Sequence, residues 1–296
     1  MYTSKDQSEI MPNIPDPDIP PIVLREMKKT WHKYRKRIAH STESKRLDGF
    51  FESMFSNGRI RSSSNQQPIL ALCPDLTAKP FWDFYDDLEL ENVGNKITSY
   101  FKDIQAEYYQ QAADKNLNDY DATYRYESLD HGDWTGYIIG SYEGINRKAQ
   151  RLFPKTCELV RMLQPYLIGR VEFLKLRPGI TIPPHTDSSN IQLTWQLGIH
   201  VESNCAIQVA NETRDIQEGK LVIFDHSFIH SAWNHGKQDR VVLLFDMKHP
   251  ELTEQEMTIY RHYHKILKYS MLKVYPVLAA KKLYSDTISR FLKRST

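Results

Sequence analysis

The stretch RVEFLKLRPGITIPPHTDSSNIQLTWQLGIHV, residues 170–201, contains three apolar runs of strand length, and the turn-forming residues of RPG and SSN separate them. Three further runs follow by residue 247, namely AIQVA, KLVIFD and RVVLLFDM. Two more lie upstream, PILAL at residues 68–72 and GYIIGSY at residues 136–142. Eight short strands joined by turns are typical of a jelly-roll barrel or sandwich of the cupin type. The βαβ alternation of a Rossmann or TIM fold is missing.

Helical patterns flank these strands. Apolar residues recur every three or four positions over residues 23–40 and again over residues 90–115, as expected of amphipathic helices. Residues 146–166 are also predicted to be helical, with a bend or break at Pro154. From Glu254 the chain is predicted to return to helix. The predicted class is therefore mainly β with flanking helices.

The charge is distributed unevenly along the 296 residues, although the net charge is only +2. Residues 21–46 contain nine Lys and Arg against two Asp and Glu, and residues 254–296 contain nine against three. We predict three segments: an N-terminal extension (1–66) of a polar stretch and a basic helix, a core domain (67–253), and a basic helical extension (254–296). The basic ends suggest either weak contact with a membrane surface or two solvated helical faces. No nucleic-acid-binding module is recognisable, so no nucleic acid partner is expected.

The composition excludes several classes of protein. The mean hydropathy is −0.57, and no run approaches the roughly 18 apolar residues of a membrane span. The start, MYTSKDQSEI, lacks the pattern of a signal peptide. The three cysteines, Cys73, Cys157 and Cys205, form neither a CxxC pair nor an even set, so a disulfide framework is not indicated. We expect a cytoplasmic, reduced protein.

The segment IPPHTDSSN places His185 and Asp187 two positions apart, on a strand or at its end. Residues i and i+2 of a strand point to the same side, so their side chains converge. His230, after the run KLVIFD, offers a third ligand. Two histidines and one carboxylate form the facial triad that suits Fe(II). Arg240 opens the next apolar run and could bind a dicarboxylic cosubstrate through its guanidinium fork.

These residues carry a resemblance to a known family. The runs RPGITIPPHTDSSN and VANETRDIQEGKLVIFDHSFIHSAWN, followed by Arg240 and then HPELT, resemble the catalytic core of the aspartyl/asparaginyl β-hydroxylase family. The similarity extends upstream through QQPILALCPDLTAKPFWD and FPKTCELVRML, and it covers roughly residues 67–253. It identifies the core domain as an oxygenase domain with a double-stranded β-helix.

The resemblance implies an enzyme that uses Fe(II), 2-oxoglutarate and O2 to hydroxylate an unactivated C–H bond. His185 and His230 match the iron-binding histidines of the family, and Arg240 matches its 2-oxoglutarate-binding arginine. Asp187 completes the triad, whereas some animal members have glycine at that place.

The chain also departs from the family pattern. Where the family usually has Arg-x-His, this chain has Thr194-Trp195-Gln196, so Gln196 and Thr194 are the candidates for binding the cosubstrate beside Arg240. Leu174 replaces a family serine, and Lys175 could compensate only from the opposite face of its strand. His226 is expected to support a ligand or to face solvent.

Three functions are compatible with these residues. The first is hydroxylation of the β-carbon of an Asp- or Asn-type residue in a peptide, of a carrier-bound amino acid or of a small molecule. The second is hydroxylation of a lipid acyl chain at a membrane surface, favoured by the basic ends and their interleaved aromatic residues. The third is a catalytically altered cupin that binds metal but has lost productive cosubstrate binding, suggested by Thr194 and Leu174.

Overall fold

The structure is a computed structural model that describes residues 21–36, 43–55, 66–83, 85–114, 117, 120–121 and 128–261. The predicted polar segment before residue 21 and most of the predicted C-terminal helix lie outside these residues. The chain divides into two compact units, one of residues 1–16 and 58–252 and one of residues 17–57 and 253–296. The elements are α1 (Pro21–Arg35), α2 (Glu43–Phe55), β1 (Phe81–Trp82), α3 (Leu88–Ser99), α4 (Phe101–Ala113), β2 (Tyr120–Asp121), β3 (Trp134–Ser141), β4 (Gly144–Ile145), α5 (Arg147–Leu152), α6 (Pro154–Leu163), β5 (Leu167–Leu176), β6 (Thr181–His185), β7 (Gln192–His200), β8 (Cys205–Val209), β9 (Glu212–Asp215), β10 (Leu221–Phe224), β11 (His230–Asn234) and β12 (Arg240–Lys248).

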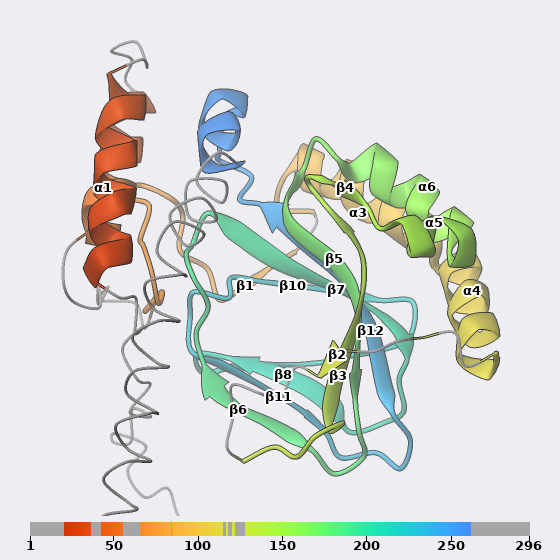
Figure 1. Ribbon diagram of the computed structural model, residues 1–296. Coiled ribbons are helices and arrows are strands. Elements are labelled where there is room, and N and C mark those ends of the chain that lie inside the picture. Colours follow the sequence, from red (N-terminus) through yellow and green to blue (C-terminus); the bar gives the residue numbers. More distant parts are fainter. Residues whose placement is uncertain are drawn as a thin grey trace, which may run out of the picture. The chain divides into compact units, whose positions relative to one another are not determined.

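Two antiparallel sheets form the first unit (Figure 1). The larger sheet has the strand order β1-β10-β7-β12-β5-β3-β2, with β4 paired to β3, and the smaller sheet has the order β6-β11-β8-β9. From β5 to β12 the chain crosses repeatedly between them, so that β5, β7, β10 and β12 belong to the larger sheet and β6, β8, β9 and β11 to the smaller one. This winding is a double-stranded β-helix, and it confirms the predicted fold class.

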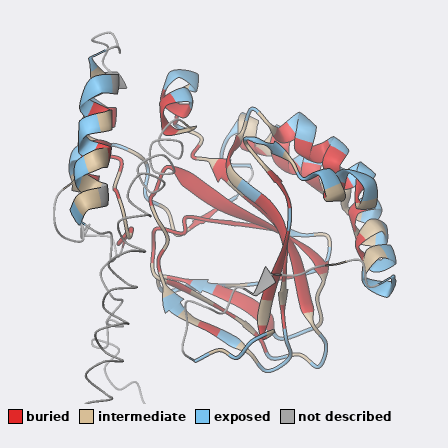
Figure 2. Cartoon of the chain, viewed as in Figure 1, coloured by how far each residue is buried: buried red, intermediate tan, exposed pale blue. Residues whose placement is uncertain are grey.

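Side-chain alternation along the strands creates two apolar layers. On β12, Val242 and Leu244 belong to an inner cluster that also contains residues of the smaller sheet, such as Ile207 and Ala232. Val241, Leu243 and Phe245 of the same strand belong to the outer cluster, which includes residues of α3, α4 and α6. Figure 2 shows the central strands of the larger sheet almost entirely buried. The inner face of this sheet therefore lines the interior of the barrel.

Helices α3, α4, α5 and α6 cover the outer face of the larger sheet (Figure 1). Asp87 caps α3, because its carboxylate accepts hydrogen bonds from the amides of Glu89 and Leu90. The single helix predicted over residues 90–115 is instead two helices, which meet at Tyr100. The predicted break at Pro154 is confirmed: α5 ends at Leu152, and the proline opens α6, where its missing amide hydrogen costs nothing.

The strand predicted at residues 68–72 is wrong. Within this segment only Ala71 forms an isolated bridge, to Ser189, and the segment lies against the loop that follows β6. Seven of the eight predicted strands are present, including GYIIGSY as β3. Two strands of the double-stranded β-helix, β9 and β11, were not predicted.

A close backbone approach fixes one end of β7. The carbonyl of Gly198 accepts a hydrogen bond from the amide of Gly219, and its own amide donates to Lys220. A Cβ on Gly198 would lie 2.2 Å from the carbonyl oxygen of Gln217, closer than any real contact. Only glycine fits here.

The second unit contains α1, α2 and the helical segment 254–261. Met27 and Trp31 of α1 are buried, and the Trp31 ring stacks on Phe51 of α2 with centroids 3.7 Å apart. Arg46 forms a two-pronged ion pair with Glu256, with both contacts at 2.6 Å. The predicted basic amphipathic helix near the N-terminus is thus confirmed as α1. Within the described ranges, no helix has the length and apolar content that a bilayer crossing requires.

Candidate metal centre

His185 and His230 are cross-strand partners. They end β6 and begin β11, and the antiparallel register pairs their Cα atoms directly. Their ring centroids lie 4.1 Å apart. A single strand pairing in the smaller sheet therefore brings together two histidines that lie far apart in the sequence.

Backbone carbonyls fix the tautomer of both rings. Nδ1 of His185 lies 2.8 Å from the carbonyl oxygen of Pro183, and Nδ1 of His230 lies 2.9 Å from that of Phe228. A carbonyl oxygen can only accept, so each Nδ1 carries a proton and donates it. In the neutral ring, Nε2 is then the basic nitrogen on each histidine, which is the form that binds a metal.

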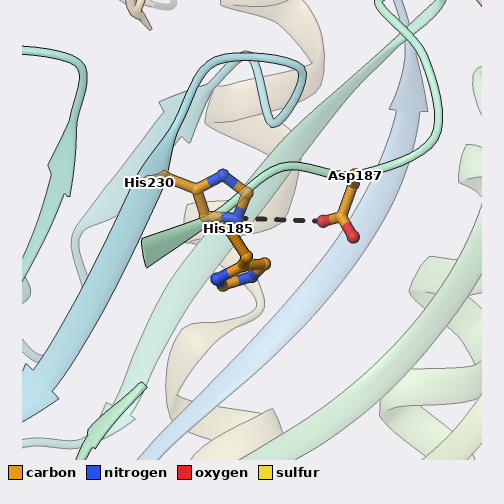
Figure 3. Close-up of side chains that lie close together, drawn as sticks. All are labelled: His185, Asp187 and His230. Atoms are coloured by element: carbon orange, nitrogen blue, oxygen red, sulfur yellow. Dashed lines mark ion pairs between the residues drawn. The ribbon is translucent and has the colours of Figure 1, made fainter. Parts of the chain in front are cut away.

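Asp187 lies two residues beyond β6, in a loop held by its backbone. The amide of Ile69 donates to the carbonyl of Asp187, and the amide of Asp187 donates to the carbonyl of His226. Oδ2 of Asp187 lies 3.8 Å from Nε2 of His230 (Figure 3). Ligand atoms of His185, Asp187 and His230 all lie within 4.8 Å of one another. The three predicted metal ligands are thus brought together, and they form two nitrogen donors and one carboxylate in one group.

The environment keeps this group ready to bind a cation. Burial, together with the nearby His185, lowers the pKa of His230 to about 3. Burial alone would raise the pKa of Asp187, but the hydrogen bond from His226 and the neighbouring imidazoles hold it below its ordinary value. At neutral pH, His230 is neutral and Asp187 is ionised, as metal ligation requires.

His226 is buried beside this group, with 3% of its surface exposed. Its Nδ1 lies 3.3 Å from Oδ2 of Asp187 and 3.2 Å from the hydroxyl of Thr194, and its Nε2 lies 3.0 Å from the carbonyl oxygen of Ser189. Burial would lower its pKa, but the hydrogen bond and charge of Asp187 raise it above the ordinary value. The sequence left two possibilities for His226, support of a metal ligand or exposure to solvent. Exposure to solvent is wrong, because the side chain is buried and contacts Asp187, a predicted metal ligand.

Arg240 carries a buried charge inside the barrel. It is 1% exposed, and within the described part of the chain neither its Nε nor its Nη1 has a hydrogen-bond acceptor. On β12 it has the same side-chain parity as Val242 and Leu244, which face the barrel interior. Burial lowers its pKa to about 10, so the guanidinium is still charged at neutral pH. A buried cation without an acceptor is costly unless an anion binds to it.

Gln196 and Thr194 also face the interior. On β7 they alternate with Leu193, Trp195 and Leu197 of the outer cluster, and both are buried. Oε1 of Gln196 has no hydrogen-bond partner within the described residues. The hydroxyl of Thr194 contacts His226 instead. Whether either residue binds a cosubstrate stays a prediction.

The remaining residues singled out in the sequence have structural surroundings. Leu174 belongs to the inner apolar cluster, and on the neighbouring strand β12 it is paired with Val242. Lys175, one residue along the strand, faces the other side and is half-buried. Cys205 is buried, with its Sγ 3.2 Å from Oδ1 of Asn234. Leu174 thus supplies only apolar surface where the family pattern has a hydroxyl.

The residues of the candidate centre lie in a part of the chain that matches a known family. The model of the family described as aspartyl/asparaginyl beta-hydroxylase matches residues 98–250, more than half of this chain. The chain belongs to the aspartyl/asparaginyl β-hydroxylase family. The matched residues include the His185–Asp187–His230 group and Arg240, so the part shared with the family is the part that forms the candidate centre.

Individual relatives cover this family domain to different extents. The aspartyl/asparaginyl beta-hydroxylase of Mus musculus is 35% identical over 129 residues, which are 42% of this chain and 17% of that protein. The aspartate beta-hydroxylase domain-containing protein 2 of Homo sapiens is 27% identical over 237 residues, which are 76% of this chain and 61% of that protein. The ornithine lipid ester-linked acyl 2-hydroxylase of Rhizobium tropici is 40% identical over 81 residues, which are 26% of this chain and 29% of that protein. The chain therefore spans less than two thirds of each relative.

Proposed function

We propose that this protein is an Fe(II)- and 2-oxoglutarate-dependent hydroxylase. The observation that carries the proposal is a facial set of two histidines and one carboxylate in the same barrel as a buried arginine, whose Nε and Nη1 have no acceptor among the described residues. The first feature suits a ferrous ion, and the second suits a small dianion. Either feature alone has many explanations, but together they match one class of oxygenase.

The residues present fit both groups. His185, Asp187 and His230 would hold the iron through two Nε2 atoms and a carboxylate, and three ligands leave open positions for other molecules. Arg240 would bind the carboxylate of 2-oxoglutarate that lies away from the metal, through its unpaired Nε and Nη1. When bound, iron and 2-oxoglutarate supply the activation of O2, with one oxygen atom passing to the substrate C–H and the other to succinate, and with release of CO2.

The protein contributes binding, orientation and exclusion of water. The carbonyls of Pro183 and Phe228 hold both histidine rings by their Nδ1 protons, which fixes the direction of the Nε2 lone pairs. Arg240 is 1% exposed on the face of β12 that carries residues of the inner apolar cluster, and burial from water strengthens a charge-assisted hydrogen bond. The side-chain amide of Gln196 can turn either its NH2 or its oxygen toward a bound molecule.

For the substrate, we propose the β-carbon of an Asp- or Asn-type residue in a peptide, or a carrier-bound amino acid or related small molecule. The names of the mammalian relatives support this choice. An acyl-chain hydroxylase is the second candidate, and two observations favour it. The Rhizobium tropici relative is named as a lipid hydroxylase. The exposed face of α1 carries Arg25, Lys28, Lys29 and Lys33, which suits an anionic surface.

Succinate release under air, with Fe(II), 2-oxoglutarate and a candidate substrate, tests the proposal. We expect release that depends on iron and that Asp- or Asn-containing peptides stimulate. Stimulation by ornithine lipid vesicles and not by peptides would favour the acyl-chain candidate. Iron binding without succinate release, with or without a substrate, would contradict the proposal and favour the catalytically altered cupin.

A further inference from the structure

His226, a buried residue, contacts both the backbone and the side chain of Asp187. The Asp187 side chain lies beyond the end of β6 and is 38% exposed, so strand pairing does not fix it. His226 contacts it twice: its carbonyl accepts from the amide of Asp187 at 2.9 Å, and its Nδ1 lies 3.3 Å from Oδ2 of Asp187. Backbone and side chain of the metal-site aspartate are thus tied to the same residue.

The ring of His226 is itself held in one orientation. Its Nε2 lies 3.0 Å from the carbonyl oxygen of Ser189, which can only accept, so Nε2 carries a proton. This contact directs Nδ1 toward the opposite side, where Oδ2 of Asp187 and the hydroxyl of Thr194 lie. The ionised carboxylate can only accept as well, so Nδ1 also carries a proton and donates it to Asp187. Ser189 belongs to the same loop as Asp187, so the two ring nitrogens of His226 contact that loop at two places.

The surroundings of His226 are rigid as well. The preceding residue, Asp225, accepts hydrogen bonds from the amide of Ser227 and from the side chain of Gln66. The backbone of residues 67–70 donates to Ser227, Asp187 and Ser188. The turn that presents His226 and the loop that presents Asp187 are therefore bound to a common segment.

We propose that His226 is a positioning residue for the metal centre, which fixes the carboxylate of Asp187 in the orientation that binds the ion. A carboxylate has two oxygens and about four acceptor positions, so it can accept from His226 and still ligate a metal. His226 would act through Asp187, the triad residue that it contacts. The inference rests on the proposed metal-binding function.

Titration of the full-length protein with Co(II), followed by its visible absorption, provides the test without requiring turnover. His226→Leu removes both ring donors at similar volume, and we expect the affinity for Co(II) to fall about 10- to 100-fold, the usual cost of removing a partner of a metal ligand. His226→Asn keeps a donor close to the position of Nδ1, and we expect it to restore most of the affinity. The absorption spectrum of the Co(II) complex should change in His226→Leu and resemble the wild type in His226→Asn.

A double-mutant cycle separates positioning from general damage to the fold. In an Asp187→Ala background, His226→Leu should cause no further loss of Co(II) affinity, because the residue on which it acts is gone. An equal loss in both backgrounds, or no loss in the single variant, would overturn the inference. Failure of the wild type to bind Co(II) or Fe(II) would instead contradict the proposed function. Circular dichroism of each apo variant verifies that it is folded.

Discussion

His185 and His230 stand directly opposite each other on the antiparallel pair β6 and β11, with their rings 4.1 Å apart. The β-scaffold therefore positions both histidines before any metal arrives, and the flanking carbonyls already select the tautomer that ligates. Preorganisation of this kind reduces the cost of ordering ligands when the ion binds. The register of one strand pair is thus the basis of the site.

Loss of either histidine should abolish tight metal binding. We expect His185→Ala and His230→Ala to lower the affinity for Fe(II) or Co(II) more than 100-fold, because losing even a partner of a ligand costs about 10- to 100-fold. His200→Ala is the matched control, since His200 contacts Tyr109 and Gln238 outside the triad. Calorimetric titration under anaerobic conditions measures the difference, and an unchanged affinity in His230→Ala would contradict the assignment.

Replacement of Arg240 should separate stability from cosubstrate binding. Arg240→Met removes a buried charge whose Nε and Nη1 have no acceptor in the described part of the chain, and it keeps much of the volume. The melting temperature without ligand should therefore stay the same or rise. The same variant should lose the thermal stabilisation that 2-oxoglutarate gives to the wild type. Differential scanning fluorimetry measures both effects. A clear drop in the melting temperature without ligand would mean that Arg240 has a structural partner.

Gly198 should tolerate no side chain. The Cβ of Gly198→Ala would lie 2.2 Å from the carbonyl oxygen of Gln217, a backbone atom that cannot move aside cheaply. We expect the free energy of unfolding to fall by about 1–3 kcal/mol, the usual cost of overpacking. Thr213→Ala, on the exposed edge strand β9, is the control and should change stability by less than about 0.5 kcal/mol. Urea unfolding curves provide both values.

The three thiols should be unreactive in the native protein. Cys73, Cys157 and Cys205 are buried, and burial raises the pKa of Cys157 to about 11. Because the thiolate is the reactive form, a disulfide reagent at pH 8 should modify none of them quickly in the native state. All three should react after denaturation in guanidinium. One rapid equivalent in the native protein would show that part of this core is open.

Much of the fold could be predicted from periodicity, and the failures have physical reasons. β11 was missed because its inward positions include His230 and Asn234, so its polar residues face the interior and disturb the expected alternation. β9 is a short polar edge strand that looks like a turn. The false strand at residues 68–72 is apolar because it packs against the loop after β6, where only isolated bridges form.

The candidate metal ligands could be proposed from the sequence on two grounds. The His-x-Asp spacing places His185 and Asp187 on one side of a strand, and the resemblance to a known family adds His230, because HxD with a later histidine is only moderately specific by itself. His226 could not be assigned, since its role depends on which carbonyl its ring meets across the fold. The signal in the sequence was the place of His226 in the run FDHSFIH, between Asp225 and Ser227. In the structure the hydroxyl of Ser227 donates a hydrogen bond to the buried carboxylate of Asp225. The lack of an acceptor for Nε and Nη1 of Arg240 among the described residues likewise could not be predicted from the sequence, because it depends on the packing around the side chain.

The most direct test of the account is an anaerobic titration of the Fe(II)-loaded protein with 2-oxoglutarate, followed by visible absorption. We predict a saturable charge-transfer band in the wild type, its absence in His230→Ala, and a requirement for at least about 100-fold more 2-oxoglutarate in Arg240→Met, the scale of a lost charge-assisted bidentate contact. A wild-type protein that binds iron but gives no band at saturating 2-oxoglutarate would contradict the central claim.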